Sequence, residues 1–196
     1  MALAKSRFDR CSSDRGFSLA ETLVAMALLA TGLLAMAQLF AIATTQNVSA
    51  RATTFSMVLA RQKAEQLRSL TWGFDASNLP LSDFSSNTAV DPPQSTGGTG
   101  LSAAAANSLT ENVPGYVDYI DGHGMSLGTG ATPPAAAVYV RRWSIEPLPT
   151  NPNNTLILQV LVFKTNARPN TGDDDATWLR QRDESRVTTA KTRKAQ

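Results

Sequence analysis

The chain has very few of the residues that build covalent cross-links or metal centres. Of its 196 residues, one is a cysteine, Cys11, and one is a histidine, His123. A single cysteine excludes an internal disulfide, and no second cysteine or histidine exists to complete a zinc site or a catalytic triad. Neither sign of charge is in large excess, since 18 basic and 16 acidic residues give a net charge of +2. Such a balance gives no bulk attraction to nucleic acid, so we expect no nucleic-acid partner.

Charge is missing altogether from one long segment. The 29 residues from Thr22 to Ala50 contain no acidic or basic side chain, and residues 23–42 are almost entirely apolar. As a helix, 20 such residues span about 30 Å, the thickness of the hydrocarbon core of a bilayer. We therefore predict a membrane span at about residues 22–42. The basic residues ahead of it predict a cytoplasmic N-terminus and an exported remainder.

An ordinary secretory signal or membrane anchor leaves one acidic residue unexplained. The A-x-A sequences Ala35–Ala37 and Ala41–Ala43 would suit signal cleavage, although the apolar run is longer than a usual signal core. A secreted or membrane-anchored binding domain of this kind makes Glu21 an accident. A carboxylate at the edge of a membrane needs a partner charge. A cut after Gly16 would create one, the α-amine of Phe17, about one helical turn from Glu21.

The segment Arg15–Ala25 reads Arg-Gly-Phe-Ser-Leu-Ala-Glu-Thr-Leu-Val-Ala. It resembles the cleavage and methylation motif of type IV pilins and type II secretion pseudopilins. In that family an inner-membrane prepilin peptidase cuts after the glycine and methylates the new N-terminal phenylalanine. The resemblance implies a leader at residues 1–16, cleavage between Gly16 and Phe17, and N-methylation of Phe17. It also implies that Glu21 neutralises the N-terminus of an adjacent subunit during assembly.

Further segments are similar to the PilV-like minor pilins, namely Gly32–Ala37 and Leu59–Arg68. Many major pilins carry a helix-kinking proline where this chain has Gln38, and its first proline is Pro80. The resemblance therefore implies a minor type IV pilin, a structural subunit that takes part in pilus assembly, with no enzymatic activity and no cofactor. Its implied partners are the prepilin peptidase, the inner membrane and other pilins. A type II secretion pseudopilin stays open, because it shares the motif and the fold.

The resemblance also implies a location and a covalent state. The precursor would be a single-pass inner-membrane protein with a periplasmic C-terminal domain, and would then enter a pilus or pseudopilus. Cys11 lies in the leader, so the mature chain would contain no cysteine. We expect its exported domain to be held together by packing alone.

Residues 51–71 keep a helical periodicity after the charge-free run. An apolar stripe is formed by Ala52, Phe55, Leu59, Leu67 and Leu70. Lys63 lies within this stripe, and we expect its ammonium group to reach water past its aliphatic stem. The pattern predicts one long helix over residues 17–71.

Residues 72–196 are predicted to form the exported β-rich domain. The Ser-, Gly- and Pro-rich part, residues 75–112, reads as loops with one short helical stretch at 101–109. Strands are predicted at 116–120, 125–127, 137–145, 156–163 and 186–191, with a long turn at 147–154. The side chains of 156–163 that face the helix are Leu156, Leu158, Val160 and Val162, and this strand suits the sheet centre. A long helix followed by antiparallel strands gives an α+β, pilin-like roll.

Other features invite chemical interpretations that we do not favour. His123 follows a turn dipeptide and is expected to face solvent rather than bind a metal. Residues 173–175 are three aspartates without the spacing of a calcium loop, so a solvated loop is expected there. Arg141 and Arg142 beside Trp143 fit the alternation of a half-exposed strand rather than a nucleic-acid site. The tail from Arg180 is expected to be a solvated end.

Overall fold

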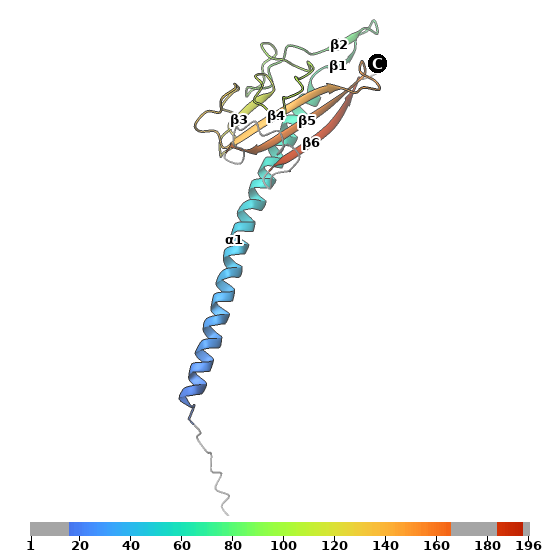
Figure 1. Ribbon diagram of the computed structural model, residues 1–196. Coiled ribbons are helices and arrows are strands. Elements are labelled where there is room, and N and C mark those ends of the chain that lie inside the picture. The colour runs from blue at the N-terminus through green and yellow to red at the C-terminus, as the bar shows by residue number, and fades with distance from the viewer. Residues whose placement is uncertain (1–15, 166–183, 194–196) are drawn as a thin grey trace, which may run out of the picture. The chain divides into compact units, whose positions relative to one another are not determined.

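The computed structural model describes residues 16–165 and 184–193 (Figure 1). The chain divides into two compact units, residues 1–47 and residues 48–196. Residues 1–15 of the predicted leader and the acidic run 173–175 lie outside the described residues.

One helix makes up most of the described part of the first unit and the beginning of the second. Helix α1 runs over Leu19–Ser69, 51 residues, and confirms the long helix that the periodicity predicts. In the second unit one face of α1 is buried, at Ala52, Ser56, Leu59, Ala60, Lys63, Ala64 and Leu67. These positions are one, three or four residues apart, which is the spacing of a single helical face.

The second unit is built on a four-stranded antiparallel sheet. Its strands are β3 (Val117–Ile120), β4 (Tyr139–Pro147), β5 (Thr155–Lys164) and β6 (Ser185–Thr192), in the order β3-β4-β5-β6. Strand β5 is therefore central, as its apolar sequence predicts, and β6 lies at an edge (Figure 1). The strands predicted at 116–120, 137–145, 156–163 and 186–191 are confirmed with shifts of at most two residues at either end.

Both faces of this sheet carry apolar clusters. On the face toward α1, Trp143, Leu158 and Val160 pack with Leu59 and Leu67 of the helix. The opposite face carries a second cluster, Val117, Tyr119, Val140, Leu161 and Phe163, onto which Leu109, Leu127 and Ala137 pack from outside the strands. Burial on both faces explains why the sequence of β5 is almost continuously apolar instead of alternating. The α+β fold of a long helix packed on an antiparallel sheet is thereby confirmed.

The polar segment that follows α1 in the sequence and precedes β3 contains more strand and less helix than expected. Strands β1 (Trp72–Phe74) and β2 (Pro80–Ser82) form a two-stranded antiparallel sheet that the sequence did not predict. Each has only three residues, and one begins with a proline, so neither gives a readable pattern. The helical stretch predicted at 101–109 is wrong. That segment forms turns, and the backbone N–H of Ala104 donates to Ile145 O in β4 at 2.9 Å.

The return strand predicted at 125–127 is also wrong as a strand. It is reduced to an isolated bridge between Ile120 and Ser126, beside a hydrogen bond from Leu127 N–H to Tyr119 O at 2.8 Å. The three glycines at 122, 124 and 128 interrupt any regular extended run there, and Gly124 and Gly128 adopt positive φ angles of 90° and 92°.

Candidate functional site

The predicted cleavage site lies directly outside the start of α1. Gly16, Phe17 and Ser18 are non-helical, and the helix begins at Leu19. The backbone N–H of Glu21 donates to Ser18 Oγ at 3.2 Å and to Ser18 O at 3.0 Å, which makes Ser18 the helix N-cap. The cap fixes where the helix starts, so the Gly16–Phe17 peptide bond precedes the helix and remains open to an enzyme.

Glu21 occupies the first turn of α1, where a carboxylate interacts favourably with the helix dipole. Ser18 and Glu21 also have the spacing of a capping box. Within residues 16–165 and 184–193 no ion pair involves Glu21, and its side chain is exposed. Its charge is therefore available to a cation from outside the described part of the chain.

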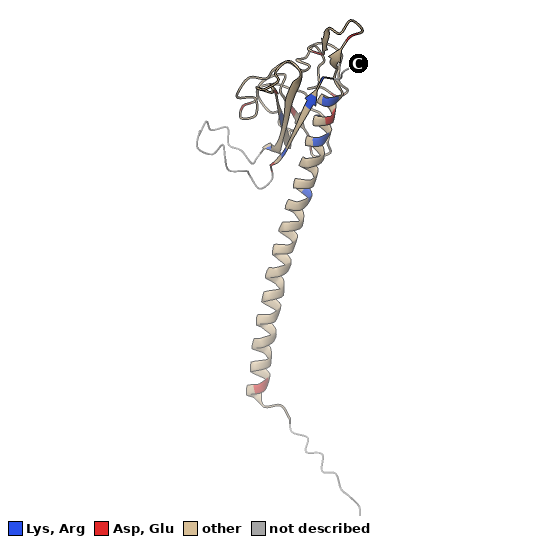
Figure 2. Cartoon of the chain, turned by 90° about the vertical axis from the view of Figure 1, so that its right-hand side faces the viewer, with Lys and Arg blue, Asp and Glu red and all other residues tan. Residues whose placement is uncertain are grey.

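The helix that follows exposes an uninterrupted apolar surface. Between Phe17 and Ile42 the large apolar side chains are 57% to 81% exposed. Figure 2 shows no charged residue along α1 between its first turn and Arg51. By length and composition this is the one helix among the described residues that could cross a membrane. An apolar surface of this extent needs a cover of lipid or of other apolar helices.

The threonine hydroxyls of this surface form hydrogen bonds within the helix itself. Each threonine hydroxyl between residues 22 and 45 donates to a carbonyl three or four residues earlier, at 2.8 to 2.9 Å. The donors are Thr22, Thr31, Thr44 and Thr45. Because no hydroxyl donor is left unpaired, these residues do not penalise transfer of the helix into an apolar medium.

Comparison with known sequence families gives one match over this region. Residues 11–37 match the family described as "Prokaryotic N-terminal methylation motif". Searches of curated proteins and of solved structures give no match. The matched segment contains Gly16, Phe17, Glu21 and the first part of the apolar helix. The start of the chain thus carries the N-terminal methylation motif of type IV pilins and pseudopilins.

The matched motif points to a class of role. Pilins are structural subunits and not enzymes. The motif implies processing by a prepilin peptidase and assembly with other pilins. Together with the apolar helix it indicates a membrane-anchored pilin.

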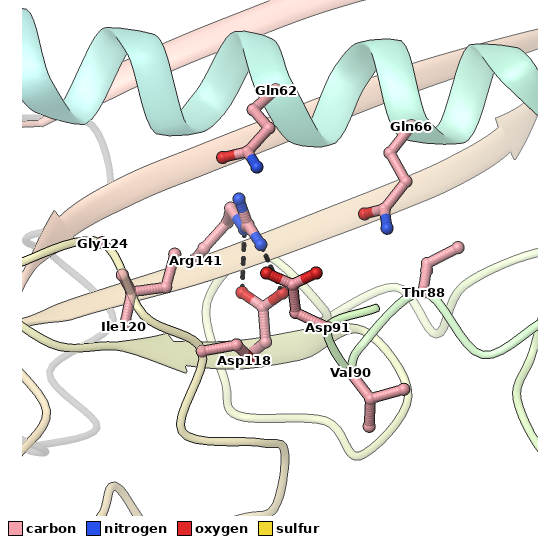
Figure 3. A pocket seen from close by; sticks show the side chains of 10 residues that line it. Gln62, Gln66, Thr88, Val90, Asp91, Asp118, Ile120, Gly124 and Arg141 are labelled. Carbon is pink, nitrogen blue, oxygen red and sulfur yellow. Dashed lines mark hydrogen bonds and ion pairs between the residues drawn. The ribbon is translucent and has the colours of Figure 1, made fainter. Parts of the chain in front are cut away.

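The second unit, residues 48–196, contains a buried ion cluster that the sequence did not reveal. Asp118 on β3 accepts two bonds from the Arg141 guanidinium on β4, Nε–Oδ1 at 2.8 Å and Nη2–Oδ2 at 2.7 Å (Figure 3). The Lys63 ammonium of α1 lies 2.8 Å from Asp118 Oδ2, and both side chains are 1% exposed. Lys63 also donates to Thr88 O. One carboxylate thus joins two strands to the helix.

The expectation that Lys63 reaches water is therefore wrong. Its neighbours Ala60 and Ala64 are 0% and 3% exposed, so the helix lies close against the sheet at this point. The ammonium instead lies 4.3 Å from the ring centroid of Trp143 and pairs with Asp118. Burial lowers the pKa of Lys63 from 10.5 to about 8, although the charge of Asp118 acts in the opposite direction.

The interpretation of Arg141 and Arg142 as residues of a half-exposed strand is also wrong. They are 7% and 4% exposed. Arg142 points to the opposite sheet face, donates to Asn112 Oδ1 at 2.9 Å and to the carbonyls of Leu109 and Thr110, and lies 4.9 Å from the ring centroid of Phe163. Both guanidinium groups are used within the domain, which leaves neither for a nucleic acid.

A small polar cavity adjoins the ion cluster. It has a volume of about 30 Å³, and Gln62, Gln66, Asp91, Asp118 and Arg141 contribute to its lining (Figure 3). Cavities that bind small organic ligands measure roughly 300–1,000 Å³, so this space suits one or two water molecules instead.

His123 lies in an exposed turn, as predicted, with 92% of its side chain exposed. Asp121 holds this turn, because its Oδ1 accepts the backbone N–H groups of His123 and Met125 at 2.8 Å each. The hydrogen bond from Met125 lowers the pKa of Asp121. Among the described residues no group of three or more His, Cys, Asp or Glu side chains is arranged to hold a metal ion. Residues 173–175 are not part of that statement.

Proposed function

We propose that this pilin is a PilV-like minor subunit of a type IV pilus. Its precursor enters the inner membrane once, with a cytoplasmic leader at residues 1–16 and a periplasmic domain. The peptidase cuts between Gly16 and Phe17 and methylates Phe17. The observation that carries the proposal is the junction at Ser18, which lies within the matched residues 11–37. Gly16 and Phe17 precede the helix there, and the helix that begins at Leu19 carries no charge over residues 22–50.

Assembly then follows from the chemistry of α1. Helices leave the lipid and pack on the apolar helices of neighbouring subunits, which cover the same surface. A carboxylate in that apolar setting requires a counter-charge, and Glu21 has no ion-pair partner among the described residues. The α-amine of Phe17 on an adjacent subunit supplies this charge, so the pair sets the axial register between the two helices.

The uninterrupted helix supports a minor role. Gln38 lies in the middle of α1, and the first proline, Pro80, comes after the helix ends. The alternative of a type II secretion pseudopilin is tested by finding which assembly contains the chain and which process fails when its gene is deleted. Recovery in purified pili, and loss of piliation on deletion of its gene, would support the pilus. Intact pili together with a defect in protein secretion would contradict it.

The processing step is tested by the intact mass and N-terminal sequence of the protein from membranes of its native host. We expect a chain that begins at methylated Phe17. A chain that begins after Ala37 or Ala43 would have lost the assembly helix, and this result would overturn the proposal in favour of an ordinary secretory signal.

Substitutions separate processing from assembly. Glu21→Ala should be cut normally but recovered in pili at a small fraction of the wild-type amount, because the register pair is lost. Glu65→Ala is the matched control, since Glu65 lies on the same helix and forms only an exposed pair with Arg68 at 2.9 Å. Gly16→Ala should be cut in part, whereas a bulky residue at position 16 should block cleavage. Normal incorporation of Glu21→Ala would refute the register role.

A further inference from the structure

An open groove lies on α1 where the charge-free run ends. It is lined by Ala50, Arg51, Thr54, Phe55 and Val58 and has a volume of about 350 Å³. All five residues belong to the second unit. Val58 is 56% exposed, and Arg51 is also exposed. The groove therefore combines an accessible cation with an accessible apolar wall.

The apolar wall is preformed by the domain behind it. The Phe55 ring packs on the Tyr139 ring of β4, with centroids 5.2 Å apart. It also lies against Gly124, where an added Cβ would be 3.5 Å from the tip of the ring. The Thr54 hydroxyl donates to Ala50 O at 2.8 Å. Arg51 is thus the polar group that the groove offers to a ligand.

The charge of Arg51 is not neutralised by the described part of the chain. No ion pair or hydrogen bond of its side chain occurs within residues 16–165 and 184–193. The same holds for Arg61, which is also exposed. Arg61 lies ten residues further along α1, about 15 Å at the rise of a helix. The two arginines therefore differ chiefly in their distance from the apolar run.

The length of the run places Arg51 at a defined level of a bilayer. Its 29 uncharged residues span about 43 Å as a helix. A bilayer measures about 40–45 Å when its headgroup regions are included. Measured from the predicted span at about residues 22–42, Arg51 is the first charged residue after the run and lies about 14 Å beyond the hydrocarbon core. Its long side chain can extend back toward the lipid phosphates on the exported side.

We propose that this groove binds the headgroup of an anionic glycerophospholipid, with the phosphate on the Arg51 guanidinium and the headgroup carbons against Phe55 and Val58. A planar guanidinium accepts two phosphate oxygens at once. The inference rests on the proposed membrane insertion of the pilin. It adds a lipid contact that holds the subunit at a fixed depth before assembly.

A second copy of the chain fits the groove less well. The apolar helix of a neighbour, residues 22–50, carries no acidic side chain to pair with Arg51. Packing it into the groove would cover the guanidinium without a counter-charge, which is costly. A lipid phosphate supplies that charge, and the acyl chains of the same lipid continue along the apolar run.

The test uses the full chain in nanodiscs of phosphatidylcholine with one fifth phosphatidylglycerol. Native mass spectrometry then counts the lipids that stay bound to the chain when it is released from the nanodisc. Wild type should retain phosphatidylglycerol in preference to phosphatidylcholine. Arg51→Gln should lower this preference about fivefold, the size of one arginine contact at a membrane surface. Arg61→Gln removes the same charge from the same helix further along and should retain the wild-type preference. Arg51→Lys should restore part of it.

The outcomes separate the inference from the proposed function. Equal preferences in Arg51→Gln and Arg61→Gln, in chains that insert normally, would overturn the lipid site alone. Arg51-dependent binding of inorganic phosphate in neutral detergent, without a preference for lipid, would overturn the lipid as the source of the phosphate. Arg51-dependent cross-linking between copies in phosphatidylcholine alone would overturn it in favour of a second copy. Extraction of the chain from membranes of its native host by alkaline carbonate would instead contradict the proposed membrane insertion.

Discussion

At the scale of single residues, Asp118 connects more of the second unit than any motif residue does. Its carboxylate contacts Arg141 at 2.7 and 2.8 Å and Lys63 at 2.8 Å. The three groups carry two positive charges and one negative charge. Residues 48–196 contain no cysteine, yet packing is not all that holds them together, contrary to the expectation from the sequence.

We predict opposite outcomes for the two partners of this cluster. Asp118→Asn leaves two buried cations without an anion and should lower the free energy of unfolding by about 3–5 kcal/mol. Lys63→Met preserves the two-bond pair of Asp118 with Arg141 and should stay within about 1 kcal/mol of wild type at pH 7. Urea unfolding of the full chain in detergent measures both. Equal losses in the two variants would mean that Lys63, too, is indispensable to the cluster.

The lowered pKa of Lys63 predicts an unusual pH dependence. Folding lowers this pKa from 10.5 to about 8, so between these values the unfolded chain binds more protons than the folded one. The free energy of unfolding should therefore rise between about pH 8 and pH 10, by up to about 3 kcal/mol. Lys63→Met should remove this rise. Measurements stop at pH 10, because the raised pKa values of Tyr116 and Tyr119 act in the opposite direction above it.

At the scale of elements, the end of β6 is fastened by an arginine that the sequence assigns to a solvated tail. The Arg193 guanidinium lies 3.6 Å from the ring centroid of Trp72. It donates to Asn153 O at 2.6 Å, to Gly73 O at 3.0 Å and to Leu81 O at 3.1 Å. One side chain thereby joins the end of β6 to both strands of the β1–β2 sheet and to the β4–β5 turn.

Arg193→Ala should loosen these elements together. We expect a loss of about 2 kcal/mol, since a cation–aromatic contact and several charged hydrogen bonds disappear. Hydrogen exchange should accelerate at residues 72–82. Arg186→Ala is the matched control, because Arg186 is exposed on the same strand and forms only a long ion pair with Glu184, at 3.9 Å, among the described residues. Unchanged exchange at residues 72–82 in Arg193→Ala would contradict the fastening role.

At the scale of the whole molecule, the two units differ in how much apolar surface they expose. Every buried residue of α1 lies at Ala52 or later, and the large apolar side chains from Phe17 to Ile42 are exposed. A chain that starts at Val48 should therefore be soluble without detergent and unfold cooperatively, within a few degrees of the full chain. Circular dichroism and calorimetry measure this. Aggregation or non-cooperative unfolding would mean that the domain needs the apolar helix to fold.

Much of this architecture was predictable because its signals are local. The helix follows from period and charge, and β4 and β5 follow from runs of β-forming residues, so each was found to within about two residues. The elements that escaped prediction depend on distant partners. Strands β1 and β2 pair only with each other, and Ala104 turns toward β4 rather than continuing a helix.

The features of the candidate site likewise divide into those that the sequence predicts and those that depend on distant partners. The sequence by itself determined the motif at Gly16, Phe17 and Glu21 and the apolar helix behind it, because cleavage, capping and membrane insertion depend on neighbouring residues and on total apolar length. Only the tertiary structure decided which charges of the second unit are buried and paired. Lys63 and Asp118 are separated by 55 positions, and their 2.8 Å contact exists because α1 packs on the sheet. From the sequence alone a charged side chain is expected to be exposed, because a partner that is distant in the sequence cannot be recognised before the fold is known.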